Sequence, residues 1–421
     1  MSPLSERAKK ILLLTLLLGV TLGIAAAMYF LFFRTSPTAS PTPAPVVTAP
    51  NGTLPGARRA QPSTGATATP GTLPTGANVP GAAGTGAAAP VSRTTSLVDF
   101  PTEFAAAGAI SATSNSALRF YNPADGKFYA TDLSGNTNPL SDHAFYNVET
   151  VSWANTNDRA ILEFPDGSNV LFDFTQNRQA TLPNHWQDFH FSPDDQQITA
   201  KSVGNNETNR YLVVSNPDGS NPQAVQELGN NADKVETTWS PSNQVVAYAH
   251  TGAPLGMDRE QVVLVGKNHE NFPGLVTEGR GLIPSWSPTG KSLLYSVYTS
   301  QNGYLPELWI TSGDATTINT NRKRLLLNTW ADKCGWSGDS VLVCAVPSSL
   351  ETGAGLQRDI ANKGPDQIYK IDLKTSQKTN LGTVDGSTDI SHVTVSADGQ
   401  TAYLVDHTSG HISSFNLRAS L

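Results

Sequence analysis

The sequence predicts an all-β fold for residues 96–421, preceded by one transmembrane helix and a disordered linker. Three observations lead to this prediction. A turn with a Trp-Ser-Pro core recurs along the chain, each turn is followed by alternating apolar and polar residues, and the composition changes twice before residue 96. We therefore treat the 421 residues as four parts, which are 1–10, 11–33, 34–95 and 96–421.

Residues 11–33 form an uncharged and mostly apolar stretch of 23 residues. A helix of this length would measure roughly 35 Å and would cross a hydrocarbon core about 30 Å thick. The alternative is a cleaved signal peptide, whose apolar core usually has about 7 to 15 residues before a small-residue cleavage site. Six further apolar residues, 28–33, follow the small residues at 25–27. We therefore expect a retained signal anchor.

Basic residues indicate the orientation of this single-pass anchor. Arg7, Lys9 and Lys10 precede the apolar stretch, and only Arg34 follows it closely. Because short basic flanks remain in the cytoplasm, we expect residues 1–10 to be a cytoplasmic tail and the rest of the chain to lie outside the cell membrane.

Residues 34–95 consist almost entirely of Pro, Thr, Ala, Gly and Ser. Such a segment cannot bury enough apolar surface to offset its conformational entropy, so we expect a disordered stalk. Sixty flexible residues would have a root-mean-square reach of roughly 40 to 45 Å.

The part of the chain after residue 99 is acidic. Residues 100–421 hold 21 basic and 33 acidic side chains, which gives a net charge near −12. A domain with this balance and without basic runs is a poor candidate for binding nucleic acid or for lying flat on anionic lipid.

The recurring turn has a regular spacing. The apolar residue before the turn lies 38, 48, 47, 50 and 59 residues from its predecessor in successive copies. These positions are Trp153, Phe191, Trp239, Trp286, Trp336 and Val395. Periods of about 40 to 50 residues with strand-type alternation are typical of a β-propeller.

Each copy has the same internal order. One strand ends near the apolar residue, the Ser-Pro-Asp-Gly type of turn reverses the chain, and an alternating second strand follows. A third strand comes next, such as residues 307–312 or 367–372, and a weaker fourth, such as 323–328. The repeat therefore predicts four-stranded blades.

The ends of the repeat region determine the number of blades. A further blade fits before Trp153, with its first strand near residues 109–112, while the last copy ends without a fourth strand. Propellers commonly close by taking the missing strand from the other end of the chain, and residues 96–100 are the candidate. We expect seven blades, with a six-bladed ring and an irregular N-terminal segment as the alternative.

The repeat resembles a known family. The turn WSPTG at 286–290, the strand LLYSVY after it, and the strands LWITS and IYKID resemble the WD40-like PD40 repeat of TolB-type propellers over roughly residues 105–421. The turn departs from the family pattern after Trp153, Phe191 and Trp336, which are followed by ANTND, SPDD and SGDS. The resemblance implies a propeller fold and no particular function.

Long loops indicate a binding face. In a propeller, the loops between second and third strands emerge at one end of the ring, and the Ser-Pro turns emerge at the other. These loops are long in three successive blades, at 251–260, 299–305 and 347–366. Adjacent long loops favour binding, although tolerated surface insertion is the alternative. The candidate residues in them are Thr251, Asp258, Arg259, Tyr304, Glu351, Arg358 and Asp359.

The two cysteines, Cys334 and Cys344, flank the SGDS turn. Because they lie near cross-strand positions in an expected oxidising compartment, we predict a disulfide, with a pair of buried thiols as the alternative. Two cysteines without a second ligand pair do not indicate a metal site.

Other polar residues were considered for metal or ligand binding. His185 with His190 and His407 with His411 have spacings that would suit two metal ligands, but each pair lacks a third, and we favour surface side chains. A carboxylate recurs before the first strand of four blades and could line the mouth of the ring, although acidic residues also suit polar turns. These residues are Asp188, Asp233, Asp332 and Asp389.

The sequence therefore predicts a binding protein. It contains no Gly-x-Ser-x-Gly, phosphate-binding glycine loop or His-Glu-x-x-His motif, and we expect no hydrolase domain, cofactor or metal. The predicted function is an extracytoplasmic interaction module of the cell envelope that binds a protein, peptide or polymer. The alternatives are a hydrolase or lyase with a site at the mouth of the ring, and a structural envelope protein without a specific ligand.

Overall fold

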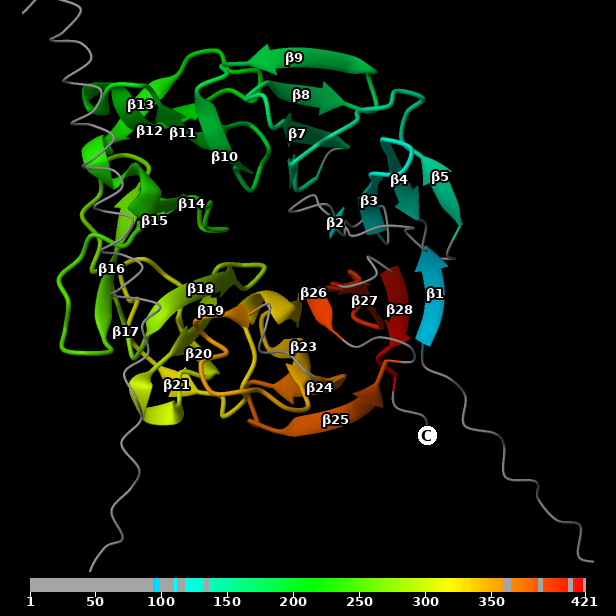
Figure 1. Ribbon diagram of the computed structural model, residues 1–421, viewed down its shortest axis with the longest axis vertical. Helices are drawn as coiled ribbons and strands as arrows, with labels where there is room; N and C mark the ends of the chain where they lie inside the picture. The colour runs from blue at the N-terminus through cyan, green and yellow to red at the C-terminus, as the bar shows by residue number, and fades with distance from the viewer. Residues whose placement is uncertain are drawn as a thin grey trace, which may run out of the picture. The chain divides into compact units, whose positions relative to one another are not determined.

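The computed structural model describes residues 94–98, 110–111, 118–131, 136–156, 158–358, 365–384, 389–407 and 412–418. These residues form seven antiparallel sheets of four strands each. In Figure 1 the sheets follow one another around a ring in chain order, with the first strand of each nearest the centre. The seven-bladed propeller predicted from the repeat is confirmed, and the six-bladed alternative is wrong.

The sheets are numbered here as blades in chain order. Blade 1 is β2 (Ile110–Ser111), β3 (Leu118–Asn122), β4 (Lys127–Thr131) and β5 (Thr137–Pro139), and blade 2 is β6 (Thr150–Trp153), β7 (Arg159–Glu163), β8 (Asn169–Asp173) and β9 (Arg178–Leu182). Blade 3 is β10 (Trp186–Phe191), β11 (Ile198–Val203), β12 (Arg210–Ser215) and β13 (Gln223–Glu227). Blade 4 is β14 (Val235–Thr237), β15 (Val245–Ala249), β16 (Glu260–Gly266) and β17 (Leu275–Thr277).

The remaining blades complete the ring. Blade 5 is β18 (Arg280–Trp286), β19 (Ser292–Tyr298), β20 (Pro306–Ser312) and β21 (Lys323–Arg324), and blade 6 is β22 (Cys334–Ser337), β23 (Val341–Pro347), β24 (Asp366–Asp372) and β25 (Lys378–Thr383). Blade 7 is β26 (Ile390–Val395), β27 (Thr401–Asp406), β28 (Ile412–Asn416) and β1 (Thr94–Val98). Four short 3-10 helices lie in the connections: η1 (Glu207–Asn209), η2 (Gly229–Lys234), η3 (Ser300–Asn302) and η4 (Ala331–Lys333).

The two ends of the described chain meet in blade 7. Strand β1 pairs antiparallel with β28, with Thr94 opposite Phe415. The N-terminal side thus supplies the fourth strand, as predicted, but the strand is 94–98 rather than 96–100. Its first two residues, 94 and 95, fall within the predicted linker, which was expected to end at residue 95. This pairing joins the first and last repeats, so the ring has no open gap between them.

The recurring turn owes its shape to its serine. In four blades the serine hydroxyl accepts a hydrogen bond from the N–H group at the start of the second strand, at 2.9 to 3.1 Å. The serines are Ser192, Ser240, Ser287 and Ser396. The third residue after each serine has a positive φ, which explains why Asp, Asn or Gly stands there.

The hydrophobic core lies between neighbouring blades. One large cluster joins Val245 and Tyr248 of blade 4 to Leu293 and Tyr295 of blade 5, and all four are almost fully buried. Trp286 stacks on Tyr248 with ring centroids 6.1 Å apart. The repeated tryptophan therefore serves packing between blades, as the repeat predicted.

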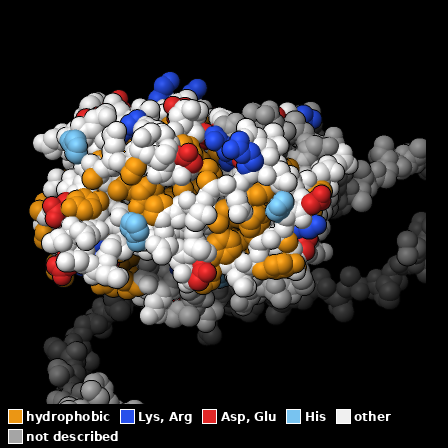
Figure 2. Space-filling view, turned by 90° about the horizontal axis from the view of Figure 1, so that it is seen from above, with side chains coloured by type: hydrophobic (Ala, Val, Ile, Leu, Met, Phe, Trp, Pro, Cys, Tyr) orange, Lys and Arg blue, Asp and Glu red, His pale blue; other side chains and the backbone are white. Residues whose placement is uncertain are grey.

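Charged groups are mixed on the surface. The side of the ring drawn in Figure 2 exposes hydrophobic side chains in several patches, with acidic and basic side chains interspersed between them. The predicted transmembrane helix, residues 11–33, and most of the predicted linker lie outside the described residues. Within the ranges described above, no helix is long and apolar enough to span a membrane.

Candidate functional site

Three long loops in neighbouring blades contact one another at one end of the ring. The first connects β15 to β16, the second connects β19 to β20, and the third connects β23 to β24. Asp258 of the first accepts a hydrogen bond from the Ser300 hydroxyl of the second at 2.6 Å. The N–H group of Gly353 in the third loop donates to the Gly303 carbonyl of the second at 2.8 Å. We call these connected segments the loop face.

The loop face exposes apolar side chains. Met257 is 83% exposed and Leu356 is 55% exposed, while Leu255 and Tyr304 are also exposed. The backbone of Tyr304 is held, because its carbonyl accepts from the N–H group of Gly355 at 2.7 Å. Exposed apolar groups on a braced surface are typical of a contact region for another molecule.

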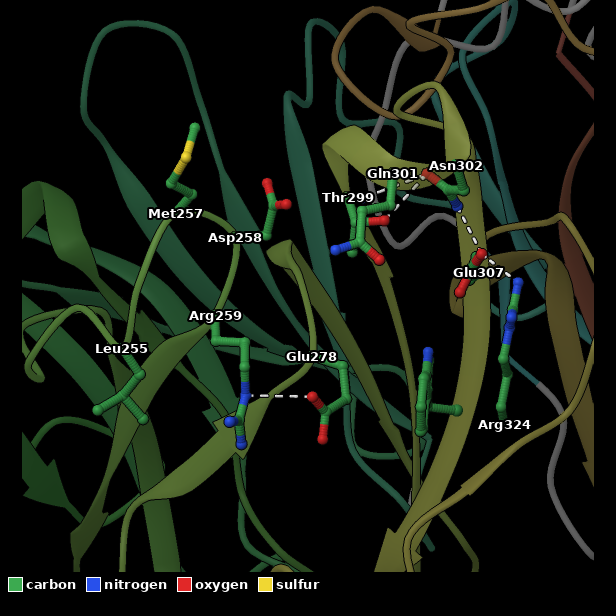
Figure 3. A pocket seen from close by; sticks show the side chains of 11 residues that line it. Leu255, Met257, Asp258, Arg259, Glu278, Thr299, Gln301, Asn302, Glu307 and Arg324 are labelled. Carbon is green, nitrogen blue, oxygen red and sulfur yellow. Dashed lines mark hydrogen bonds and ion pairs between the residues drawn. The ribbon is translucent and has the colours of Figure 1, made fainter.

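A pocket of about 610 Å³ opens between blades 4 and 5 beneath the loop face. Polar residues form most of its wall, with Leu255 and Met257 near the loop and one aromatic residue, Trp309, in the lining. Figure 3 shows ten of its residues, labelled, around the opening. The polar lining consists of Asp258, Arg259, Glu278, Thr299, Gln301, Asn302, Glu307 and Arg324.

Two strands of blade 5, β20 and β21, form one side of this pocket. Glu307 and Trp309 are two residues apart on β20, so their side chains leave the same face of the sheet. Arg324 lies directly opposite Trp309 on β21 and shares that face. Leu308 points to the other face and packs in the core toward blade 6.

The charged groups of the pocket are paired within it. Glu278 forms ion pairs with Arg259, at 3.1 Å from Nε, and with Arg322 outside the lining, at 3.1 Å from a terminal nitrogen. Glu307 accepts from Asn302 Nδ2 at 2.6 Å and from Arg324. Figure 3 shows the pairs Arg259 with Glu278 and Glu307 with Arg324 on two sides of the pocket. Glu278 and Glu307 thus each have a guanidinium partner, whereas Asp258 accepts from Ser300.

The candidate residues from the sequence are only partly gathered here. Asp258 and Arg259 line the pocket. Thr251, Tyr304 and Glu351 lie in the three loops outside the pocket lining, and Asp359 lies outside the described residues. Arg358 belongs to a different cluster, as the next paragraphs describe.

Sequence reasoning missed the strand residues of the pocket. Glu278, Glu307, Trp309 and Arg324 lie in or beside strands, whereas the predicted binding residues lie in loops. The alternation in residues 307–312 was the available signal, because it puts a carboxylate and an indole on one face.

A second group of charged residues joins blades 6 and 7. Arg358 contacts Asp332 at 2.5 Å, and its guanidinium lies 4.8 Å from the centre of the Trp330 ring. Together with Asp389, Ser391 and His407, Arg358 and Asp332 line a smaller cavity of about 220 Å³.

A buried lysine lies in the same region. Lys333 Nζ contacts Asp366 at 2.8 Å and Asp389 at 3.1 Å. Burial raises the pKa of Asp366, although Lys333 and the N–H group of Ile390 oppose the change. This arrangement links η4, which precedes the first strand of blade 6, to the third strand of blade 6 and to the residue before the first strand of blade 7.

The recurring aspartates were expected in polar turns or around the mouth of the ring. Asp188, like Asp332 and Asp389, contacts a basic side chain, with Lys201 Nζ at 3.1 Å. Burial opposes ionisation of Asp188, but the charges of His190 and Lys201 lower its pKa. Among the residues that the structure describes, no three His, Cys, Asp or Glu side chains are grouped so that they could hold a metal ion.

Neither histidine pair belongs to a group of three possible metal ligands among the residues that the structure describes. His190 is exposed on β10, its Nδ1 lies 2.9 Å from the hydroxyl of Thr237, and the surrounding protein, which displaces bulk water, lowers its pKa. His407 lies beside the cavity at Arg358, and His411 lies outside the described residues.

The two cysteines form a disulfide in the structure. Cys334 on β22 and Cys344 on β23 face each other directly across the two strands. The bond therefore joins the first and second strands of blade 6.

Comparisons with known proteins identify the fold. No family model and no curated protein sequence matches the chain. An oligogalacturonate lyase in complex with manganese has a TM-score of 0.53 and 13% identity, covering 78% of this chain and 93% of that chain. The Cps50 (Swd1) β-propeller domain of Myceliophteria thermophila has a TM-score of 0.50 and 11% identity, covering 77% and 100%.

A third solved structure, hydrazine synthase of Kuenenia stuttgartiensis, has a TM-score of 0.50 and 14% identity, covering 76% of this chain and 96% of that chain. At such identities the likeness concerns the fold, which is a WD40-like β-propeller. A lyase, a synthase and the Cps50 (Swd1) β-propeller domain all share this fold, so the fold does not identify a function. Function has to be argued from the site.

Proposed function

We propose that this protein is a TolB-like, membrane-anchored propeller that acts outside the cytoplasm as an interaction module of the cell envelope. The observation that carries this proposal is the loop face. Three loops that are far apart in sequence are hydrogen-bonded into one surface, and they expose Leu356 and also Met257, which lines the pocket. A surface of this kind suits binding and requires no catalytic group.

The anchor and the compartment are supported by separate features. The apolar residues 11–33 follow a basic tail, which favours a helix with its N-terminus in the cytoplasm. The disulfide between Cys334 and Cys344 suits an oxidising compartment. An alkaline phosphatase fused after Leu421 should therefore be active in cells, and an inactive enzyme would contradict the proposed orientation.

The loop face is tested by capture of partners from envelopes. The full-length protein with Met257→Ser and Leu356→Ser should recover less of its main crosslinked partner than the unchanged protein, by about tenfold if these side chains are central to the contact. Both side chains are exposed, so the variant should fold normally.

The matched control replaces exposed apolar residues outside the loop face. Tyr146 and Leu326 are 61% and 66% exposed, and Tyr146→Ser with Leu326→Ser should leave capture unchanged. Equal recovery by the loop-face variant and the unchanged protein would remove the loop face from the proposal.

An enzyme remains the competing proposal. It would be a hydrolase or lyase at the mouth of the ring, where several His, Asp, Glu or Asn side chains would have to converge on a substrate. The aspartates of that region that contact a cation, such as Asp332 and Asp389, are held in ion pairs between blades. We favour binding because the loop face provides a continuous contact surface.

A further inference from the structure

Three carboxylates and two arginines line the pocket beneath the loop face, and a third arginine, Arg322, contacts Glu278 from outside the lining. Asp258, Glu278 and Glu307 face Ser300, two arginines and one arginine respectively, so no carboxylate in the pocket lacks a donor. A charged ligand would have to lose its hydration and compete with these existing partners. The pocket therefore favours a ligand without net charge.

Trp309, the aromatic residue of the pocket, exposes only carbon atoms of its ring. Trp309 is partly buried and packs against the core between blades 4 and 5. Its indole Nε1 is buried without a hydrogen-bond partner in the structure, so the part of the ring that remains exposed consists of carbon atoms. A ligand would contact Trp309 through its apolar ring face.

The polar wall can still form hydrogen bonds without losing its ion pairs. Arg259 contacts Glu278 through Nε, so its terminal nitrogens remain as donors, and Gln301 adds an amide group. A hydroxyl group both donates and accepts, and it can therefore bind a carboxylate and a guanidinium that are already paired. A purely apolar ligand would bury these polar groups without compensation.

A sugar ring combines the features that this pocket requires. It is uncharged, it has one face of C–H groups that can lie on an indole, and its edge carries hydroxyl groups. The volume of about 610 Å³ falls within the range of roughly 300 to 1,000 Å³ that is usual for small-ligand sites. We propose that the pocket binds one or more units of a neutral glycan, with Trp309 as the stacking surface.

This inference deepens the proposed function and rests on it, because it identifies the class of molecule that the loop face would help to hold. The experiment uses the full-length protein in a zwitterionic detergent that has no sugar headgroup. It is applied to an array of neutral oligosaccharides, acidic oligosaccharides and peptides. Calorimetry then measures the affinity for the array member that binds best, and a pull-down on purified envelope polysaccharide tests the polymeric source.

Substitutions at Trp309 and Trp286 distinguish stacking of a ligand on the Trp309 indole from packing in the hydrophobic core. Trp309→Leu should weaken binding of a neutral oligosaccharide by about tenfold or more, whereas Trp309→Phe, which keeps a flat ring, should weaken it by less than about threefold. Trp286→Leu is the matched control, because Trp286 packs on the same core cluster and does not line the pocket. It should leave the affinity unchanged.

A second variant tests the pocket without changing a residue of the hydrophobic core. Arg259 is exposed on the rim, and Arg259→Met should fold and should lower the affinity by about threefold to tenfold. If Trp309→Leu fails to fold, Trp309→Phe and Arg259→Met still decide the outcome.

The proposal would be overturned if no neutral glycan bound, if a folded Trp309→Leu variant bound as well as the unchanged protein, or if the best array member were a charged sugar or a peptide. Failure of the proposed function would give a different result. If the proposed function failed, the variant with Met257→Ser and Leu356→Ser would capture envelope partners as well as the unchanged protein does.

Discussion

Removing the charge of Lys333 should destabilise the ring strongly. Its side chain is 0% exposed, and that of its partner Asp366 is 1% exposed. In Lys333→Met the shape of the side chain is approximately kept, but Asp366 becomes a buried carboxylate without a cation. Breaking a buried pair in this way costs about 3 to 5 kcal/mol.

The size of the ring sets the expected change in melting temperature. Unfolding entropy is roughly 2.1 cal/mol/K per residue, which gives about 0.7 kcal/mol/K for a ring of about 330 residues. A loss of about 3 to 5 kcal/mol should therefore lower the melting temperature by about 4 to 7 °C. Circular dichroism of the full-length protein at pH 7 measures this change.

The dependence on pH provides a second check. Burial already raises the pKa of Asp366 above its usual range, and loss of Lys333 should raise it further. Because a raised carboxylate pKa means that the folded state binds the proton more readily, the deficit of Lys333→Met should shrink as the pH falls through that pKa.

A double variant separates charge from packing. In Lys333→Met with Asp366→Asn, the amide oxygen can still accept from the Ile390 N–H group, which lies 2.6 Å from Asp366. This variant should regain at least half of the lost stability. Lys378→Met, at an exposed lysine, should change the melting temperature by less than about 1 °C. A single-variant loss below about 1 °C, or a double variant no more stable than the single, would refute the reasoning.

Three further variants test other parts of the ring. Asp195 accepts from the N–H groups of Asn155 and Thr156 at 2.6 and 2.8 Å. Asp195→Ala should therefore lower the free energy of unfolding by about 2 to 4 kcal/mol. The control Asp218→Ala, in an exposed turn, should lower it by less than about 1 kcal/mol. The Glu260 carboxylate, 3.7 Å from His250 Nδ1, chiefly raises the pKa of His250, and Glu236 at 3.6 Å from Nε2 adds to this. The protonated ring therefore stabilises the fold fully below about pH 6.5, and this contribution is lost as the pH rises through the folded-state pKa. In His250→Gln the melting temperature should fall less between pH 6 and pH 8 than in the unchanged protein, and an equal fall would contradict the assignment. Cys334→Ser with Cys344→Ser should lower stability by up to about 3 kcal/mol in thermal melts, and reducing agent should affect the unchanged protein alone.

The turn and the tryptophan determined the fold at the level of sequence. Ser240 and Ser287 each hold the N–H group that begins the next strand, and this interaction spans only five residues. Such local chemistry is readable from a short motif. Its repetition predicted blades, and the absence of a fourth strand after residue 416 predicted closure by a strand from the N-terminal side.

The position of that closing strand was less well predicted. Residues 94–98 form it, rather than 96–100, because the register is set by pairing with β28, more than three hundred residues later in the chain. Local alternation does not reveal such a long-range choice.

The sequence by itself determined the repeat and the presence of three long loops in succession, and it favoured seven blades over six, which the structure decided. Only the tertiary structure decided which residues form the pocket, since Arg259 and Glu278 come from blade 4 and its link to blade 5, and Glu307, Trp309 and Arg324 come from strands of blade 5. It also decided that Arg358 would contact Asp332 instead of that pocket. The physical reason is that strand motifs are fixed by neighbours in sequence, whereas a site between blades depends on side chains that only the packing of one blade on the next brings within contact distance.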